Sequence, residues 1–157
     1  MKFHMVRWVG DVNGHYYYDI IMPGIEMHLK NGNLPITLLL NSEGGHLQIA
    51  KSFIDEMKLR KIPLNTYVTG RVASAAIPIC TIGKKRYMDE ESHFFFHPLK
   101  FWEKEEKRKE ANLREWYKNE IAKNTRLAPT EVQGLMDEKR LIGSKEAKKM
   151  GLINEIV

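Results

Sequence analysis

The fold is decided by the stretch from Thr69 to Ile82, which reads TGRVASAAIPICTI. It begins next to a glycine, passes through small residues on both sides of Ser74, and becomes apolar from Ile77 onward. The β-branched run just before it, residues 65–68, has strand character. The pattern predicts a strand, a tight turn and a buried helix, with Ser74 at or just inside the start of that helix.

Two roles fit a serine at this place. Serine caps helices well, because its hydroxyl accepts a hydrogen bond from an amide of the first turn that has no partner within the helix. The same unpaired amides can stabilise an oxyanion, so Ser74 could also act as a nucleophile beside them. Taken alone, the segment favours the cap, and the choice depends on the rest of the chain.

Strand and helix alternate on the N-terminal side of this segment. Residues 3–10 read as a strand, and residues 16–30 carry apolar side chains at helical spacing. Residues 36–40, ITLLL, form an apolar run of strand length that suits a sheet covered on both faces. A helical apolar stripe follows over residues 47–57. The alternation over residues 36–82 predicts an α/β fold around a parallel sheet with right-handed crossovers.

A pair of glycines separates that buried strand from the helix after it, in the turn Asn41-Ser-Glu-Gly-Gly45. Glycine adopts backbone angles closed to other residues and lets a second backbone or a ligand approach closely. An ordinary strand-to-helix turn explains the pair equally well, so the turn by itself assigns no function.

The chain after the central segment continues the sheet and adds helices. Residues 85–88 and 93–97 read as short strands, and Pro98 stops the second one. A long helix is predicted from about Trp102 to Thr125, beginning with a run of eight charged residues, 103–110. Two shorter helices follow. The first is predicted to begin with a Thr130…Gln133 capping box, and the second to begin with Ser144 as its N-cap and to end at Gly151. A final strand is predicted over residues 152–157.

Composition places the chain among ordinary globular proteins. Its 157 residues are 43% hydrophobic and 29% charged, which suits one domain spanning residues 1–157. We expect no membrane span and no signal peptide, and the single Cys80 excludes an internal disulfide. These features together favour the cytoplasm. The net charge of +5 is spread among acidic residues, so we expect no nucleic-acid partner.

Histidine offers the other candidate for chemistry. None of the six histidines has the spacing of a metal-binding motif, so we expect neither a metal nor a cofactor. His97 is distinct because it ends a predicted strand after three phenylalanines and precedes a proline. Its side chain should emerge where the chain leaves the sheet, a place where α/β folds commonly hold ligands.

Five motifs together resemble one family, the proteolytic subunit of the Clp protease, which belongs to the crotonase-like superfamily. They occur in the family's order and cover almost the whole chain from about Gly10: the Gly-Gly turn, Gly70-Arg-Val-Ala-Ser74-Ala, Gly83-Lys-Lys-Arg86, Phe96-His97-Pro98, and Ser144-Lys-Glu-Ala147 with Gly151-Leu. The resemblance implies a crotonase-like, Clp protease-like spiral of β-strands with outer helices.

The resemblance also implies a function, that of a serine-type endopeptidase acting on polypeptides. By the family's pattern Ser74 is the nucleophile, His97 the general base, and the backbone amides of Gly44 and Ala75 the oxyanion hole. Serine needs an adjacent base that accepts its proton. Loss of one oxyanion donor typically costs roughly 100- to 1000-fold in rate. A homo-oligomeric, heptameric ring is implied as well, with the stacking of two rings and an ATPase partner left open.

Several positions depart from the family's pattern. The position of the third, acidic triad member is occupied by Lys139. A small shift could bring either of the preceding acids, Asp137 or Glu138, to His97, and we predict that Asp137 orients it. Glu43 replaces the usual proline before the glycines, and Pro78 lies in the serine helix. The segment after Pro98 is shorter than in the family, which weakens the expectation of stacked rings.

Three other functions remain open. A serine–lysine peptidase could use Lys118 from the long helix, provided that burial keeps this amine neutral. A ring subunit of the same fold could have lost its triad, as Lys139 suggests. An acyl-CoA enzyme of the same superfamily would build its oxyanion hole in the same way, although Ser74 paired with His97 argues against it.

Overall fold

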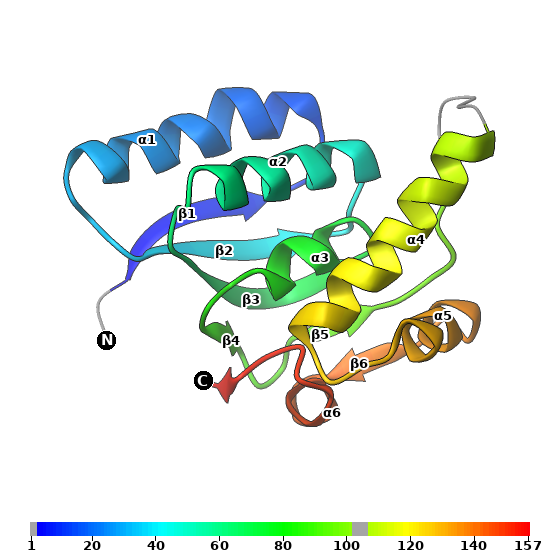
Figure 1. Cartoon of the computed structure of the whole chain (residues 1–157). Helices are drawn as coiled ribbons and strands as arrows, with labels where there is room; N and C mark the ends of the chain where they lie inside the picture. Colours follow the sequence, from blue (N-terminus) through cyan, green and yellow to red (C-terminus); the bar gives the residue numbers. More distant parts are fainter. Residues whose placement is uncertain (1–2, 102–106) are drawn as a thin grey trace.

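The computed structural model describes residues 3–101 and 107–157, which form a sheet with helices packed around it (Figure 1). The α/β class predicted from the sequence is confirmed. The strands are β1 His4–Val9, β2 Ile36–Ser42, β3 Leu64–Ala73, β4 Arg86–Met88, β5 His93–Phe95, β6 Leu141–Gly143 and β7 Glu155–Ile156. The helices are η1 Tyr16–Ile21, α1 Met22–Lys30, α2 Leu47–Leu59, α3 Ala76–Thr81, α4 Lys107–Asn124, α5 Pro129–Asp137 and α6 Ser144–Met150.

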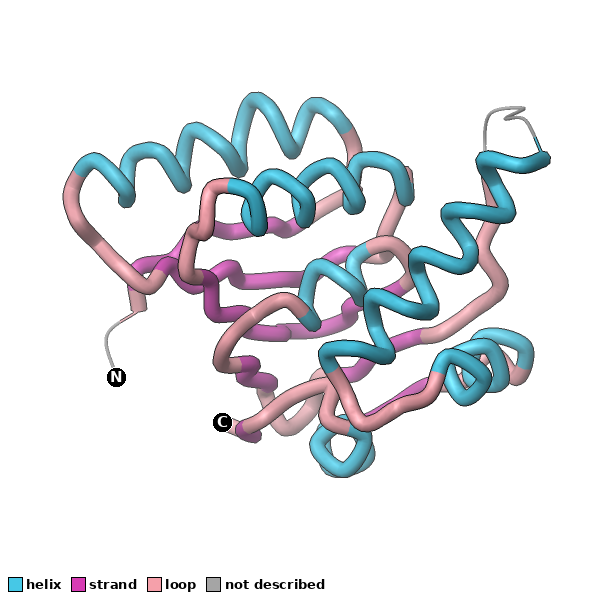
Figure 2. The backbone as a smooth tube through the Cα atoms, viewed as in Figure 1, coloured by secondary structure: helices cyan, strands magenta, loops and turns pink. Residues whose placement is uncertain are grey.

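The sheet branches at β3, and this branching positions the candidate site. Strands β1, β2, β3, β4 and β7 lie side by side in that order, all parallel. The first part of β3, residues 66–68, pairs with β4, whereas its last part, residues 71–73, pairs with β5. Strand β6 then runs antiparallel to β5. The tube trace shows the two branches leaving the long central strand (Figure 2).

One face of the sheet is covered by α1 and α2 (Figure 1). The ring of Trp8 on β1 lies 5.2 Å from that of Phe53 on α2, nearly perpendicular to it. Gly24 of α1 lies against Val6, where an added Cβ would come within 3.2 Å of a valine methyl group. Val9 at the end of the edge strand β1 is 46% exposed, whereas residues 36–40 of β2, which we predicted to be covered on both faces, are buried or half-buried.

Helix boundaries differ from the sequence-based expectations at several ends. The helix predicted over residues 16–30 opens with the wider π-helical turns of η1. The start of the long helix, predicted at Trp102, lies outside the described residues, and α4 is described from Lys107. Strand β7 is shorter than the predicted strand at 152–157. None of the described helices combines the length and apolar character needed to cross a membrane.

Two predicted caps are wrong, for a common physical reason. Helix α5 begins at Pro129, and the Ala128 amide donates to Glu131 at 3.2 Å, so the Thr130…Gln133 pair is not the capping box. Ser144 is the first residue of α6, and its hydroxyl donates to the Glu90 carbonyl at 2.9 Å. At α5 the local acceptor Glu131 takes the capping position, and at α6 the Ser144 hydroxyl bonds a distant carbonyl in place of its own helix. The predicted stop at Gly151 is confirmed, in the left-handed conformation at φ 76°.

Candidate active site

Two neighbouring strands bring the predicted nucleophile and base to the same edge. Ala73, the last residue of β3, pairs with Phe95, the last residue of β5. Ser74 follows the first strand directly, and His97 follows the second after one residue. Because parallel strands end at the same edge of a sheet, both residues leave the sheet there, as predicted for ligand-binding residues of α/β folds.

Ser74 occupies a sharp left-handed bend between β3 and α3, with φ 50°. A non-glycine residue in this region is uncommon and costs free energy, so the surrounding structure must hold it in place. The Ser74 amide donates to the Phe95 carbonyl at 3.4 Å, and the Ser74 carbonyl accepts the Ile77 amide at 3.0 Å. Helix α3 has no side-chain cap, so the hydroxyl of Ser74 does not act as one.

A second helix also contacts this bend. The hydroxyl of Tyr117, on α4, donates to the Ser74 carbonyl at 3.1 Å. Tyr117 is completely buried, and burial raises the pKa of its phenol well above the ordinary value, which keeps the hydroxyl protonated as a donor. Sequence reasoning missed this residue, because Tyr117 reads there only as part of the apolar stripe of the long helix.

The glycine turn approaches the serine bend closely. Gly44 has φ 98°, and a Cβ added to it would come within 2.8 Å of both the Ala73 carbonyl oxygen and Ser74 Cβ, and 3.0 Å from the Ala75 nitrogen. Only glycine fits this position without displacing backbone. The structure therefore brings together Gly44, Ser74 and Ala75, three of the five residues that the sequence assigned to the site.

The two predicted oxyanion donors differ in their present partners. The Gly44 amide donates to the hydroxyl of Ser42 at 3.1 Å, so an incoming oxyanion would have to compete with that bond. The Ala75 amide lies at the start of α3, where helix amides lack an internal acceptor. A cavity of about 330 Å³ borders this turn, and it is lined by Asp11, Val12, Asn13, Glu43, Gly44, Gly45 and His46.

His97 carries its proton on the nitrogen that suits a general base. Its Nδ1 lies 2.8 Å from the carbonyl oxygen of Pro98. Because a carbonyl can only accept, Nδ1 must be the protonated nitrogen, and Nε2 then has a free lone pair in the neutral ring. Within residues 3–101 and 107–157, however, no hydrogen bond joins His97 to Ser74.

Among the described residues, neither Asp137 nor Glu138 forms a hydrogen bond or ion pair with His97. Asp137 accepts a hydrogen bond from the Gln133 amide group at 2.8 Å on the exposed side of α5. The β5–β6 ladder ends with Phe95 paired with Leu141, and beyond it the Phe96 amide donates to the Arg140 carbonyl at 2.9 Å. Lys139 precedes Arg140 in a left-handed turn, with φ 53°. The family's acid position is therefore occupied by a lysine in sequence, in the turn before β6.

Two further side chains considered from the sequence are Lys118 and Cys80. Lys118, the alternative base, forms an ion pair with Glu115 at 2.6 Å. Cys80 is fully buried in α3, as expected, and burial raises the pKa of its thiol to about 11. A thiol with so high a pKa is a poor nucleophile at neutral pH.

Comparison with known proteins gives a consistent result. A model of the Clp protease family matches residues 6–157. The chain resembles the "ATP-dependent Clp protease proteolytic subunit 1" of Bifidobacterium longum, with 24% identity over 149 residues, covering 88% of this chain and 64% of that protein. It is also 29% identical over 73 residues to the protein of the same name from Chlamydia trachomatis, covering 45% of this chain and 38% of the relative. The chain thus spans less than two thirds of the length of these relatives.

A solved structure extends the likeness to three dimensions. The ClpP1 N165D mutant from Listeria monocytogenes superimposes with a TM-score of 0.87 at 26% identity, covering 98% of this chain and 91% of that one. The match confirms the Clp protease-like arrangement expected from the sequence motifs. On the family match over nearly its whole length, this chain belongs to the Clp protease family.

Proposed function

We propose that this protein is a serine peptidase that cleaves polypeptides through an acyl-enzyme formed on Ser74. One observation carries the proposal: Ser74 is held in a left-handed bend against the backbone of Gly44, with the Ala75 amide beside it. A serine in a loop of no function would not need this strained conformation, nor a glycine packed against it. Membership of the Clp protease family supports the same reaction class.

The proposed chemistry follows from the positions of these groups. His97 accepts the proton of the Ser74 hydroxyl on Nε2 while the serine oxygen bonds to the substrate carbonyl carbon. The Gly44 and Ala75 amides stabilise the negative oxygen of the tetrahedral intermediate. Collapse breaks the carbon–nitrogen bond, and His97 returns the proton to the departing amine. Water then hydrolyses the ester, with His97 as the base once more.

In the resting arrangement the Pro98 carbonyl takes the place of a triad acid on His97 Nδ1. A neutral carbonyl fixes the ring's tautomer but stabilises the imidazolium less than a carboxylate does, so we expect a slow enzyme. Asp137 remains our predicted acid. To orient His97, its carboxylate must give up the hydrogen bond that it accepts from Gln133. Asp137→Asn tests this: a rate loss of about a hundredfold or more supports the triad, and a loss under about twofold assigns the orienting role to Pro98 alone.

Labelling with a fluorophosphonate probe tests the nucleophile. We expect the wild type to be labelled, and labelling to be absent in Ser74→Ala and strongly slowed in His97→Gln. Ser52→Ala is the matched control, because Ser52 is a partly exposed serine on α2 that bonds only the Gln48 carbonyl, and it should label at the wild-type rate. Equal labelling of Ser74→Ala and wild type would refute the assignment.

A subunit that has lost catalysis is the second candidate function. Two observations favour it: Lys139 occupies the family's acid position in sequence, and the described residues contain no Ser74–His97 hydrogen bond. A lysine near the imidazole would oppose the imidazolium that the reaction requires. This candidate predicts that the assembled protein is not labelled at all, whereas the Ser–His peptidase is labelled in that same state.

We further propose that the chain works as a homo-oligomeric ring of seven subunits on polypeptide substrates. The family resemblance supports the ring, and the ATP-dependent relatives make an ATPase partner a reasonable second hypothesis. Val9 at the end of β1 and Tyr18 on η1 are large side chains exposed by 46% and 61%, which a neighbouring subunit could cover.

A further inference from the structure

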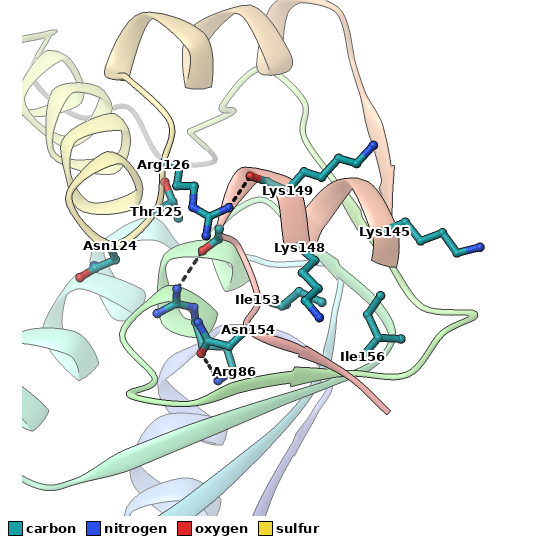
Figure 3. Close-up of a pocket in the computed structure, with 11 residues that line it drawn as sticks. Arg86, Asn124, Thr125, Arg126, Lys145, Lys148, Lys149, Ile153, Asn154 and Ile156 are labelled. Atoms are coloured by element: carbon teal, nitrogen blue, oxygen red, sulfur yellow. Dashed lines mark hydrogen bonds between the residues drawn. The ribbon is translucent and has the colours of Figure 1, made fainter.

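A basic cavity lies on the part of the molecule formed by α6, β7 and the connection between α4 and α5 (Figure 3). Its volume is about 610 Å³, well within the range of small-molecule sites. Five of its lining side chains are cationic, and none of its lining residues is acidic. The cations are Arg86, Arg126, Lys145, Lys148 and Lys149.

Within the described part of the chain, these five cations lie together around one cavity without an acidic partner. Among the described residues none of the five forms an ion pair, whereas Lys58, Arg60 and Arg140 each pair with glutamates. Like charges gathered around one cavity repel each other, and an anion placed among them would relieve that repulsion.

The two guanidinium groups are held in place by backbone carbonyls. Arg86 donates to Gly151 at 2.8 Å and to Leu152 and Gly83 at 3.0 Å, and it is only partly exposed. Burial lowers the pKa of Arg86, although its guanidinium stays charged, so a positive charge remains without a full negative charge beside it. Arg126 donates to the Lys149 carbonyl at 3.3 Å. Groups fixed in advance lose little entropy when they bind a ligand.

The three lysines of the cavity all come from α6. Figure 3 shows Lys148 extending from the helix toward Ile153, while Lys145 and Lys149 point outward from the same helix. Lys148 can therefore reach a ligand in the cavity, and the two outer lysines add to the positive potential at its entrance. The floor contains Ile153, which is almost fully buried.

We propose that this cavity binds a small anion that carries two or more phosphate groups. Arginine binds phosphate oxygens with paired, charge-assisted hydrogen bonds, and lysine adds a compact point charge. A singly charged anion would neutralise one of five cations, whereas a chain of phosphates can reach Arg126 and Lys148 together. The site lies on α6 and β7 rather than at the Ser74 bend, so the inference does not depend on the peptidase proposal.

Calorimetric titration of the whole chain with tripolyphosphate tests the inference. At low ionic strength we expect saturable binding of one ligand per chain, weakened by added salt because the contact is electrostatic. The double variant Arg126→Gln/Lys148→Gln should weaken binding by about tenfold or more, since it removes two charged hydrogen-bond donors. Arg86 is left unchanged because its carbonyl contacts support the fold.

The matched control removes two positive charges elsewhere. Lys30→Gln/Lys84→Gln changes two exposed lysines that do not line the cavity, one at the end of α1 and one in the turn before β4, and should alter the affinity by no more than about twofold. Equal weakening by both double variants would show attraction to diffuse charge and overturn the proposal. So would the absence of saturation at about 1 mM ligand, or orthophosphate binding as tightly as tripolyphosphate.

Discussion

At the scale of single residues, the surrounding structure must hold Ser74 in a left-handed backbone conformation that serine does not favour. A left-handed non-glycine residue costs on the order of 1–3 kcal/mol. Three contacts offset this cost: the strand pair ending at Phe95, the amide of Ile77, and the buried hydroxyl of Tyr117. The last contact comes from a helix 43 residues away in sequence, so it ties the bend to the packing of α4.

Removing only that hydroxyl should loosen the bend. Tyr117→Phe keeps the buried ring and deletes a hydrogen bond worth about 1 kcal/mol, so we expect a fall in melting temperature of about 2–4 °C. If this hydrogen bond contributes its full free energy to the transition state of labelling, fluorophosphonate labelling of Ser74 should slow about fivefold without it. The measurements are thermal unfolding and the labelling rate of the assembled protein.

A separate readout distinguishes positioning from plain stability. In Tyr117→Phe, hydrogen exchange at the amides of residues 74–77 should quicken more than at β1, whose residues lie far from the bend. Tyr87→Phe is the control, because it removes a tyrosine hydroxyl from a strand away from Ser74. Unchanged exchange at the bend together with an unchanged labelling rate would contradict a positioning role.

The sequence could predict the residues of the site that depend on local pattern. A serine among small residues after a strand, and paired glycines after another, each follow from backbone constraints that the sequence displays. The Tyr117 contact could not be predicted, because an apolar stripe does not say which of its members reaches across the core. The Pro98 carbonyl on His97 was missed for the same reason: backbone acceptors leave no mark in the residue types.

At the scale of elements, α4 is anchored to α2 by a buried acid. Glu120 is 2% exposed at its side chain and pairs with Lys58 of α2 at 2.6 Å and with Lys123 at 2.9 Å. Burial alone would raise the pKa of Glu120, but the hydrogen bonds from Lys123 and Lys58 outweigh it and lower the pKa below 4.5. Because α4 also carries Tyr117, this anchor supports the serine bend indirectly.

The sign of the pH dependence follows from that lowered pKa. The folded state binds the Glu120 proton less readily than the unfolded chain does, so the pair stabilises the fold at neutral pH. This contribution is lost as the pH falls below the unfolded value of about 4.5 and through the lower folded value. Glu120→Gln should therefore reduce the free energy of unfolding by about 1–2 kcal/mol at pH 7, because the two lysines are partly exposed and can be hydrated.

Denaturant unfolding at several pH values checks this. The difference between wild type and Glu120→Gln should shrink toward zero in acid, where the wild-type carboxyl is also neutral. Glu115→Gln is the control on the same helix, since Glu115 is 64% exposed and its pair with Lys118 should contribute little. A difference that stays constant with pH would mean that the side chain's shape, and not its charge, matters.

The order of elements was predictable, whereas their ends were decided by tertiary contacts. Apolar periodicity indicated β1, β2, α2 and β3 because these elements bury continuous stripes of side chains. The branching of the sheet at β3 was not predictable, because a strand's residues do not show that its two halves pair with different neighbours. That branching nevertheless decides where Ser74 and His97 emerge.

At the scale of the whole molecule, the single chain leaves apolar surface that an assembly would cover. Leu59 at the end of α2 is 83% exposed, and Met27 on α1 is 54% exposed. Burying such side chains against another copy is favourable by about 25 cal/mol per Å² of apolar area. Closed rings of identical subunits satisfy this need without leaving a free edge.

A heptameric ring has a definite mass and should carry the activity. Seven chains of 18.3 kDa give a particle of about 128 kDa, against 18.3 kDa for the free chain. We expect light scattering after size-exclusion chromatography to find the larger particle. We also expect fluorophosphonate labelling of Ser74 to concentrate in it, because in the proposed ring neighbouring subunits would support the site. Ser74→Ala should assemble equally well, which separates assembly from chemistry. Full labelling of a monomeric fraction would show that one chain suffices and that the ring is not required for the serine to react.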